Sequence, residues 1–133
     1  MRRLVVRRLG LIGLLVCMAA CTSAPPAAAP QRFVVYFQEW SAALDDSAQG
    51  TVAAAAKWAA DHPNQSVAVN GFADPEGSKQ ANIDISRTRA QLVVDQLVKD
   101  GVSQQRIRLG AKGPTDFTLS SQESRRVEIA IGS

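Results

Sequence analysis

The sequence contains few of the residues on which catalytic, metal and nucleic-acid sites most often depend. Its 133 residues include one histidine, and aromatic residues make up only 5% of the chain. A single histidine argues against a His-rich metal site and against a Ser-His-Asp catalytic triad. The scarcity of aromatic rings argues against a stacking platform for single-stranded nucleic acid.

An excess of positive charge is also missing from most of the chain. The formal charge is +3, but Arg2, Arg3, Arg7 and Arg8 supply four of the 15 basic residues. From Cys21 onward, 11 basic and 12 acidic residues leave a charge of −1. A nearly neutral domain gives no reason to expect nucleic acid as a partner.

No apolar run reaches the length of about 20 residues that a membrane-spanning helix needs. The uncharged stretch 9–20 follows an arginine-rich start, as in a bacterial export signal. The tetrapeptide Met18–Cys21 (MAAC) resembles the lipobox, in which small residues precede a lipidated cysteine. We therefore expect residues 1–20 to be a lipoprotein signal peptide and Cys21 to be lipidated. The alternative is an ordinary signal peptide, whose removal would leave Cys21 as a free thiol.

Residues 22–30 (TSAPPAAAP) have no charge and three prolines. Polyproline II conformation, at about 3.1 Å per residue, makes this segment a semi-rigid spacer of roughly 30 Å. We expect residues 21–31 to be the lipidated N-terminus and its tether, and residues 32–133 to be one domain held close to a membrane. Thr22 replaces the Asp that retains many lipoproteins at the inner membrane, which favours the periplasmic face of the outer membrane.

Hydrophobic periodicity predicts a single α/β domain. Strands are expected at 33–37, 66–71, 106–109 and 126–131, from alternating or β-branched runs. Helices are expected from Ser47, as the N-cap, to Ala60 and from about 78 to 100, with Gly101 as the C-terminal cap. The order β-α-β-α-β-β predicts a two-layer sandwich with helices packed on a mixed sheet. Trp40 and Trp58 are expected to pack in it rather than to bind a ligand.

Polar residues follow one face of the longer predicted helix. Asn82, Ser86 and Arg89 are spaced i, i+4 and i+7 and border its apolar stripe. The preceding loop 71–77 (GFADPEG) leaves the end of a strand, where ligands of α/β sheets gather. Asp74 and Arg89 can therefore face one cleft, with the carboxylate taking an ammonium group and the guanidinium taking a carboxylate. Alternatively, Asp74 only forms the turn and Arg89 is solvated, or the two form an exposed ion pair worth about 0–1 kcal/mol.

The stretch 70–90 (NGFADPEGSKQANIDISRTRA) resembles the signature of the OmpA C-terminal-like family. The matching residues are Gly71, Ala73, Asp74, Gly77, Asn82, Ile85, Ser86, Arg89 and Ala90. Phe33–Phe37 (FVVYF) is similar to the opening strand of this family. Ser124–Ile129 (SRRVEI) is similar to its closing Asn-Arg-Arg-Val-Glu-Ile, with serine in place of asparagine.

The resemblance implies a protein that binds peptidoglycan non-covalently through the diaminopimelate of the stem peptide. It implies that Asp74 holds the ammonium group and Arg89 the carboxylate, and that Asn82 and Ile85 line the cleft. It further implies an outer-membrane lipoprotein that tethers the membrane to the cell wall, with no catalysis, cofactor or metal. Since one family member has a partner in the Tol system, the resemblance adds a Tol-like envelope protein as a candidate partner.

Other functions remain as alternatives. Asp74 and Glu76 could imitate the carboxylate pair of a glycosidase, but they lie two residues apart in one turn. Flagellar stator subunits contain a domain of the same family, but they carry a transmembrane helix with a proton-binding acid, and residues 4–21 contain no acid. The third alternative is an envelope scaffold protein with a vestigial cleft, whose surface binds a protein partner.

Overall fold

The structure is a computed structural model that describes residues 29–114 and 120–132. The elements follow in the order β1 (Gln31–Tyr36), α1 (Asp46–Asp61), β2 (Val67–Ala73), α2 (Lys79–Lys99), the 3-10 turn η1 (Gln104–Arg106), β3 (Ile107–Pro114), α3 (Ser121–Ser124) and β4 (Arg126–Ile131). The predicted α/β class and the order β-α-β-α-β-β are confirmed, with η1 and α3 as additional short turns. The predicted signal peptide, Cys21 and residues 22–28 of the tether lie outside the described residues.

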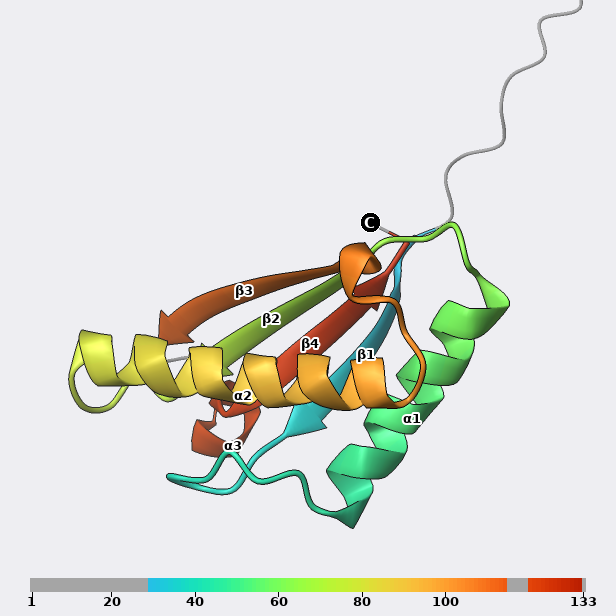
Figure 1. The fold of residues 1–133 in the computed structure, drawn as a ribbon. Coiled ribbons are helices and arrows are strands. Elements are labelled where there is room, and N and C mark those ends of the chain that lie inside the picture. The colour runs from blue at the N-terminus through green and yellow to red at the C-terminus, as the bar shows by residue number, and fades with distance from the viewer. Residues whose placement is uncertain (1–28, 115–119, 133) are drawn as a thin grey trace, which may run out of the picture.

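The four strands form one mixed sheet in the order β1-β4-β2-β3. β2 and β3 are parallel and are joined by the crossover through α2, whereas β4 lies antiparallel between β1 and β2. This arrangement, visible in Figure 1, brings the end of β2 and the start of β4 to the same end of the sheet, where Gly71 pairs with Val127. The candidate site forms at this end.

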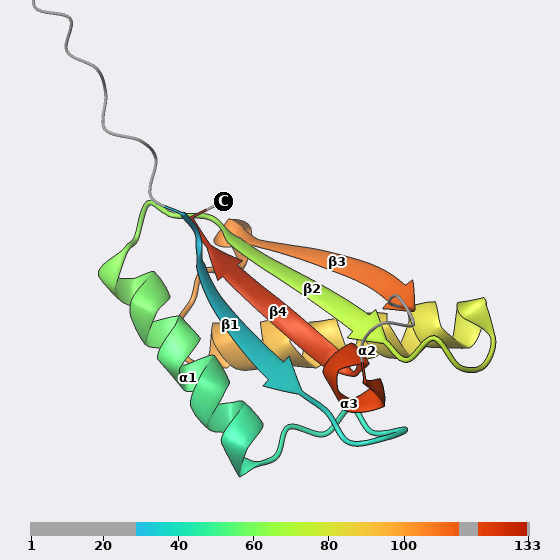
Figure 2. The ribbon, with the colours of Figure 1, turned by 180° about the vertical axis from the view of Figure 1, so that it is seen from behind.

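The core lies between one face of the sheet and the two long helices. Along β4, Val127, Ile129 and Ile131 are buried, while the residues between them are partly exposed. α1 contributes mainly small side chains to this core, and α2 contributes larger ones. Figure 2, which views the molecule from behind, shows that the opposite face of the sheet is not covered by either helix. The predicted two-layer sandwich is therefore confirmed.

The start of α1 differs from the prediction. Asp45, rather than Ser47, is the N-cap residue, and its carboxylate accepts a hydrogen bond from the Ala48 N–H at 2.8 Å. Aspartate and serine offer the same kind of acceptor, and the negative charge of aspartate also suits the positive end of the helix dipole. The observed N-cap residue therefore lies two residues before the one predicted from the sequence.

The C-terminus of α2 agrees with the prediction. Gly101 has a φ of 103°, in the left-handed region that glycine adopts without steric cost. Its N–H donates to the Val98 carbonyl at 3.0 Å, and the Val102 N–H donates to the Leu97 carbonyl at 2.9 Å. These two bonds form a Schellman motif, which ends the helix and turns the chain toward β3.

Trp58 lies at the surface of α1 rather than inside the sandwich. Its side chain is 38% exposed, and its ring stacks on His62 with the two ring centroids 4.1 Å apart. The single histidine thus packs beside a helix end. Nowhere in residues 29–114 and 120–132 does a helix combine the length and the apolar character that crossing a membrane requires.

Candidate functional site

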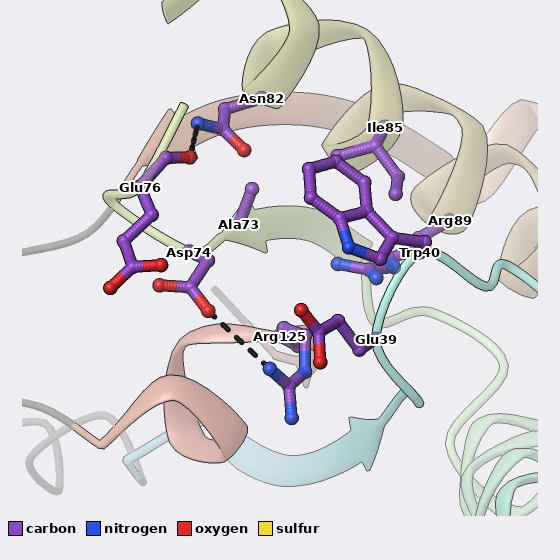
Figure 3. Close-up of a pocket in the computed structure, with 9 residues that line it drawn as sticks. All are labelled: Glu39, Trp40, Ala73, Asp74, Glu76, Asn82, Ile85, Arg89 and Arg125. Atoms are coloured by element: carbon purple, nitrogen blue, oxygen red, sulfur yellow. Dashed lines mark hydrogen bonds and ion pairs between the residues drawn. The ribbon is translucent and has the colours of Figure 1, made fainter. Parts of the chain in front are cut away.

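A pocket opens at the end of the sheet where β2 ends and β4 begins (Figure 3). It encloses about 350 Å³ of empty space, including some that is open to solvent. Its walls are Glu39, Trp40, Ala73, Asp74, Glu76, Asn82, Ile85, Arg89 and Arg125. These residues come from the loop after β1, the end of β2 and its loop, the first half of α2, and the junction of α3 with β4. We call this the strand-end pocket.

The strand-end pocket has more charged side chains in its wall than two larger hollows of the described structure. Two other hollows enclose about 780 and 620 Å³. Asp45 is the only charged residue in the wall of the first, and His62 is the only ionisable residue in the wall of the second. Five acidic or basic side chains line the strand-end pocket, which makes it the place where a charged ligand would be recognised.

Asp74 directly follows β2, and its side chain is 21% exposed. Its ion-pair partner is Arg125, whose Nη1 lies 3.4 Å from the Asp74 Oδ2, and not Arg89. A partly exposed pair at this distance contributes about 0–1 kcal/mol. A ligand can therefore compete for the Asp74 carboxylate at little cost.

Arg89 projects from α2 and is one of the largest buried side chains of the domain, with 1% of its surface exposed. Its Nε–H donates to the Ser41 carbonyl at 2.8 Å, and its Nη2 donates to the Gln38 carbonyl at 3.1 Å. The guanidinium also lies 5.3 Å from the centroid of the Phe37 ring. The alternative expectation of a solvated Arg89 is therefore wrong. The loop after β1 fixes the guanidinium in place.

Burial has an electrostatic consequence for Arg89. Desolvation by burial and, to a smaller extent, the charge of Arg125 lower its pKa to about 10, although the charge of Asp74 partly offsets them. The group remains protonated at neutral pH. Because a guanidinium has five N–H donors, those not used by the two backbone carbonyls are available to a carboxylate ligand.

The predicted polar stripe of α2 lies partly at the pocket and partly against the sheet. Asn82 is 4% exposed and donates from Nδ2 to the Glu76 carbonyl at 2.7 Å, which ties the loop after β2 to the helix. Figure 3 shows its amide oxygen turned toward the pocket. Ile85 is half-buried and gives the pocket an apolar wall. Ser86 lies outside the pocket, where its Oγ donates to the Ile83 carbonyl at 2.9 Å.

Ser86 contacts the sheet instead. Its Oγ accepts a hydrogen bond from the Gly113 N–H of β3 at 3.2 Å. The backbone of α2 passes so close to β2 that a Cβ on Gly71 would overlap the Ser86 carbonyl oxygen. Gly71 and Ser86 of the family-like signature therefore have a packing role, and Asp74, Asn82, Ile85 and Arg89 lie around the strand-end pocket.

Sequence reasoning missed the position of Trp40. We expected it to pack in the domain, but its side chain is 75% exposed and its φ of 53° lies in the left-handed region. The backbone carbonyls on either side, at Gln38 and Ser41, are held by Arg89, so the intervening residues turn outward. Figure 3 shows the indole beside Ile85 and Arg89. The only sequence feature that could have indicated this exposed position was an aromatic residue in a polar loop after a strand.

Arg125 is the second residue whose place in the site was not predicted. Its Nε is buried and has no hydrogen-bond partner in the described structure. Such an unpaired charged donor is costly, and a ligand acceptor would satisfy it. The sequence analysis included Arg125 only in the family-like stretch Ser124–Ile129 and gave it no role in the site. It reaches Asp74, 51 residues away, because β4 lies beside β2.

The charges of the pocket suit a ligand with both signs of charge. Arg89 and Arg125 can bind a carboxylate, and Asp74 and Glu39 can bind an ammonium group, at positions fixed by separate elements. The described part of the chain contains no group of three His, Cys, Asp or Glu side chains that could hold a metal ion.

Comparison with known proteins identifies a family. The sequence pattern of the OmpA family matches residues 36–129. The peptidoglycan-associated lipoprotein of Rhizobium meliloti (strain 1021) is 30% identical over 105 residues, which cover 74% of this chain and 60% of that protein. The probable lipoprotein YiaD of Escherichia coli (strain K12) is 31% identical over 103 residues, or 73% of this chain and 47% of that protein. The chain thus spans about half to three fifths of these relatives.

A third relative has a name that states its ligand. The peptidoglycan-binding protein ArfA of Mycobacterium tuberculosis (strain ATCC 25618 / H37Rv) is 36% identical over 75 residues, which cover 52% of this chain and 23% of that protein.

Solved structures share the fold. The peptidoglycan-associated lipoprotein of Burkholderia pseudomallei superposes with a TM-score of 0.68 at 23% identity, covering 74% of this chain and 89% of that one. The C-terminal domain of Helicobacter pylori MotB superposes with a TM-score of 0.66 at 20% identity, covering 75% and 84%. At these identities the likeness shows a shared fold.

Proposed function

The chain belongs to the OmpA family, and from this membership and the strand-end pocket we propose that it binds peptidoglycan non-covalently as an outer-membrane lipoprotein. Family membership also makes it a binding protein rather than an enzyme. The observation that carries the proposal is that Asp74 and Arg89, 15 residues apart in the sequence, line one pocket. Relatives named for peptidoglycan binding support the choice of ligand.

The ligand group is the free end of diaminopimelate in the stem peptide, which carries an ammonium and a carboxylate on one carbon. The carboxylate accepts hydrogen bonds from Arg89, and the ammonium donates to Asp74. Asn82 holds the loop that carries Asp74, and Ile85 packs against the methylene chain of the ligand. The hydrogen bonds to charged groups contribute about 1.5–3 kcal/mol each.

Arg125 changes partner when the ligand binds. In the structure it neutralises Asp74 at 3.4 Å, while its buried Nε has no acceptor. The incoming ammonium replaces Arg125 at Asp74, and the ligand carboxylate gives the guanidinium of Arg125 a new acceptor beside Arg89. The exchange leaves Asp74, Arg89 and Arg125 each beside a charge of the opposite sign, which limits the desolvation cost of binding.

The anchor is at the other end of the domain. β1 begins at Gln31, which pairs with Ile131 at the end of β4, and β4 begins beside the pocket. β1 therefore begins at the end of the sheet remote from the strand-end pocket, beside the C-terminal end of β4 (Figure 2). With Cys21 lipidated and residues 22–30 as spacer, the membrane and the wall are held by opposite ends of one domain. Many stems on one polymer raise the weak affinity of a single pocket by avidity.

The rival function is an envelope scaffold that uses the same fold to bind a protein, such as a Tol-like partner, with a vestigial pocket. The fixed Arg89 favours a working pocket, because its bonds to Ser41 and Gln38 use only some of its five N–H donors and hold the rest in place at the pocket wall. A protein partner on another surface remains compatible with wall binding.

Retention on isolated peptidoglycan tests the proposal. We expect Asp74→Asn, which keeps the size of the side chain but removes its charge, to lower retention of the mature chain at least tenfold. Asp84→Asn on the exposed side of α2 is the matched control and should bind like the wild type. Free meso-diaminopimelate should elute the bound protein, and 1,5-diaminopentane, which has both ammonium groups but no carboxylate, should not. Equal retention of the two variants would favour the scaffold function instead.

A further inference from the structure

The uncovered face of the sheet carries a positive charge that wall binding does not use, and we propose that this face docks on an anionic lipid surface. The face, called here the open sheet face, contains the side chains that alternate with the core residues of each strand. Its charged members are Arg32, Arg108, Lys112, Arg126 and Glu128. The proposal goes beyond the strand-end pocket, but takes from the proposed function the lipid on Cys21.

Strand register and contacts place these residues together. Arg32 of β1, Ala130 of β4, Ala68 of β2 and Arg108 of β3 form one row across the sheet. Lys112 belongs to the same face, because a Cβ on Gly110 would lie 3.9 Å from its Cε.

The positive charge of the domain is concentrated on the open sheet face. The five charged residues of the open sheet face sum to +3. The remaining described residues contain seven basic and ten acidic side chains and sum to −3. An anionic surface therefore attracts the open sheet face more strongly than the rest of the described domain, so that it orients the domain as well as binding it.

The spacing of the cations fits a surface better than a small anion. Arg32 and Arg108 stand on the two edge strands, and strands about 4.8 Å apart separate them by roughly 14 Å. Between them lie the small side chains of Ala130 and Ala68, so nothing projects to hold a single ligand. Arg32 lies 3.5 Å from the Glu128 carboxylate, but an exposed pair contributes only about 0–1 kcal/mol. Arg32, Arg108 and Lys112, spread over a flat face, can therefore contact several headgroups of a bilayer at once.

Aromatic side chains accompany the cations. Tyr36 at the end of β1 is 47% exposed. The guanidinium of Arg126 lies 4.1 Å from the centroid of the Phe72 ring, and its Nε donates to Glu128 at 2.8 Å. Tyrosine is enriched where proteins meet the membrane–water interface, because its ring is apolar and its hydroxyl is polar.

The position of the tether favours a bilayer over an acidic protein as the occupant. Arg32 follows Gln31, the first residue of β1, so the basic row begins where the tether enters the fold. Nine residues separate Cys21 from Gln31, which keeps the face within the reach of the lipid anchor. A tethered surface has a high effective concentration, so even weak attraction is enough to hold it.

Vesicle sedimentation of the chain from Thr22 onward tests the docking without the lipid. This chain contains the whole fold, since all strand pairing and the core lie within residues 31–131. We expect it to sediment with vesicles that contain phosphatidylglycerol at 50 mM salt and not with vesicles of phosphatidylcholine alone. The triple variant Arg32→Ala/Arg108→Ala/Lys112→Ala should lose about a hundredfold in partitioning, since each basic residue near an anionic membrane contributes about fivefold.

The control removes three cations from the helical side. Lys57→Ala/Lys79→Ala/Lys99→Ala changes the net charge equally and should sediment like the wild type. Equal losses in the two triple variants, or equal sedimentation with both kinds of vesicle, would overturn the proposal. The proposal would also be overturned if the Arg32→Ala/Arg108→Ala/Lys112→Ala variant still bound the vesicles but no longer bound an acidic protein that binds the wild type. Retention on peptidoglycan should be unchanged in both triples, so a failure here is distinguishable from a failure of wall binding.

Discussion

Arg89 shows how one residue can be both part of the fold and part of a binding site. Its guanidinium donates to the carbonyls of Gln38 and Ser41, 51 and 48 residues earlier in the chain. These bonds fix the loop that carries Glu39 and Trp40 and orient the guanidinium before a ligand arrives. Binding then costs little side-chain entropy, which is the advantage of a preorganised site.

Stability measurements should separate Arg89 from Asp74. Arg89→Ala leaves two backbone carbonyls without their donors and a cavity beside Phe37, so we expect the free energy of unfolding to fall by about 2–4 kcal/mol. Asp74→Asn loses only a partly exposed ion pair and should change it by less than about 1 kcal/mol. Denaturant unfolding of both variants measures the difference. Similar losses would mean that Arg89 is not the structural centre of the pocket.

The residues of the site differed in how well the sequence predicted them. Asp74 and Arg89 could be placed near each other because one loop and three turns of one helix connect them, and helical periodicity fixes which residues share a face. Arg125 could not, because its place depends on which strands are neighbours. Trp40 was expected inside on composition, whereas the hydrogen bonds of Arg89 to the surrounding loop decide where it points.

At the scale of elements, the contact of α2 with β2 sets the position of the site. The helix backbone at Ser86 lies against Gly71, and the Ser86 hydroxyl accepts a hydrogen bond from β3. This contact lies one turn of α2 from both Asn82 and Arg89. A shift of the helix would therefore displace both pocket residues together.

Two glycine substitutions test the closeness of this contact. Gly71→Ala would place a methyl group on the Ser86 carbonyl oxygen, so we expect a loss of about 1–3 kcal/mol in stability and weaker peptidoglycan retention. Gly50→Ala in α1 has no heavy atom within 4 Å of the new Cβ and should gain about 0.5–1 kcal/mol. Thermal unfolding of both variants gives the comparison. A neutral Gly71→Ala would show that the helix and the strand are less closely packed.

Local signals predicted the elements better than their arrangement. Turn glycines and capping residues act within a few positions, which is why the end of α2 at Gly101 was predicted correctly and the cap of α1 was missed only by the choice between Asp45 and Ser47. The order β1-β4-β2-β3 rests on pairing between distant strands. No periodicity within one strand specifies its neighbour.

At the scale of the whole molecule, the proposed functions occupy different surfaces. The strand-end pocket lies at one end of the sheet, β1 begins at the other, and the open sheet face lies between them. Wall, lipid anchor and bilayer can therefore be engaged together. The leader and Cys21 lie outside the described residues, so the anchor rests on the lipobox-like tetrapeptide alone.

Substitution of Cys21 tests the anchor separately from the pocket. We expect Cys21→Ser to move the protein from the membrane fraction to the soluble periplasmic fraction, because it removes the site of acylation. The intact mass of the wild-type mature protein should show acyl chains on Cys21 as its first residue. Retention of the purified variant on peptidoglycan should be unchanged. An unmodified Cys21 in the wild type would remove the membrane from the proposed function.

The decisive experiment is calorimetric titration of the chain from Thr22 onward with a soluble stem peptide ending in diaminopimelate. We expect saturable binding to the wild type, with affinity at least tenfold lower for Asp74→Asn and for a stem that ends in lysine, since each change removes one charged contact worth about 1.5–3 kcal/mol. Equal affinities across these three titrations would contradict the assignment of Asp74 and Arg89 as the two halves of a zwitterion site.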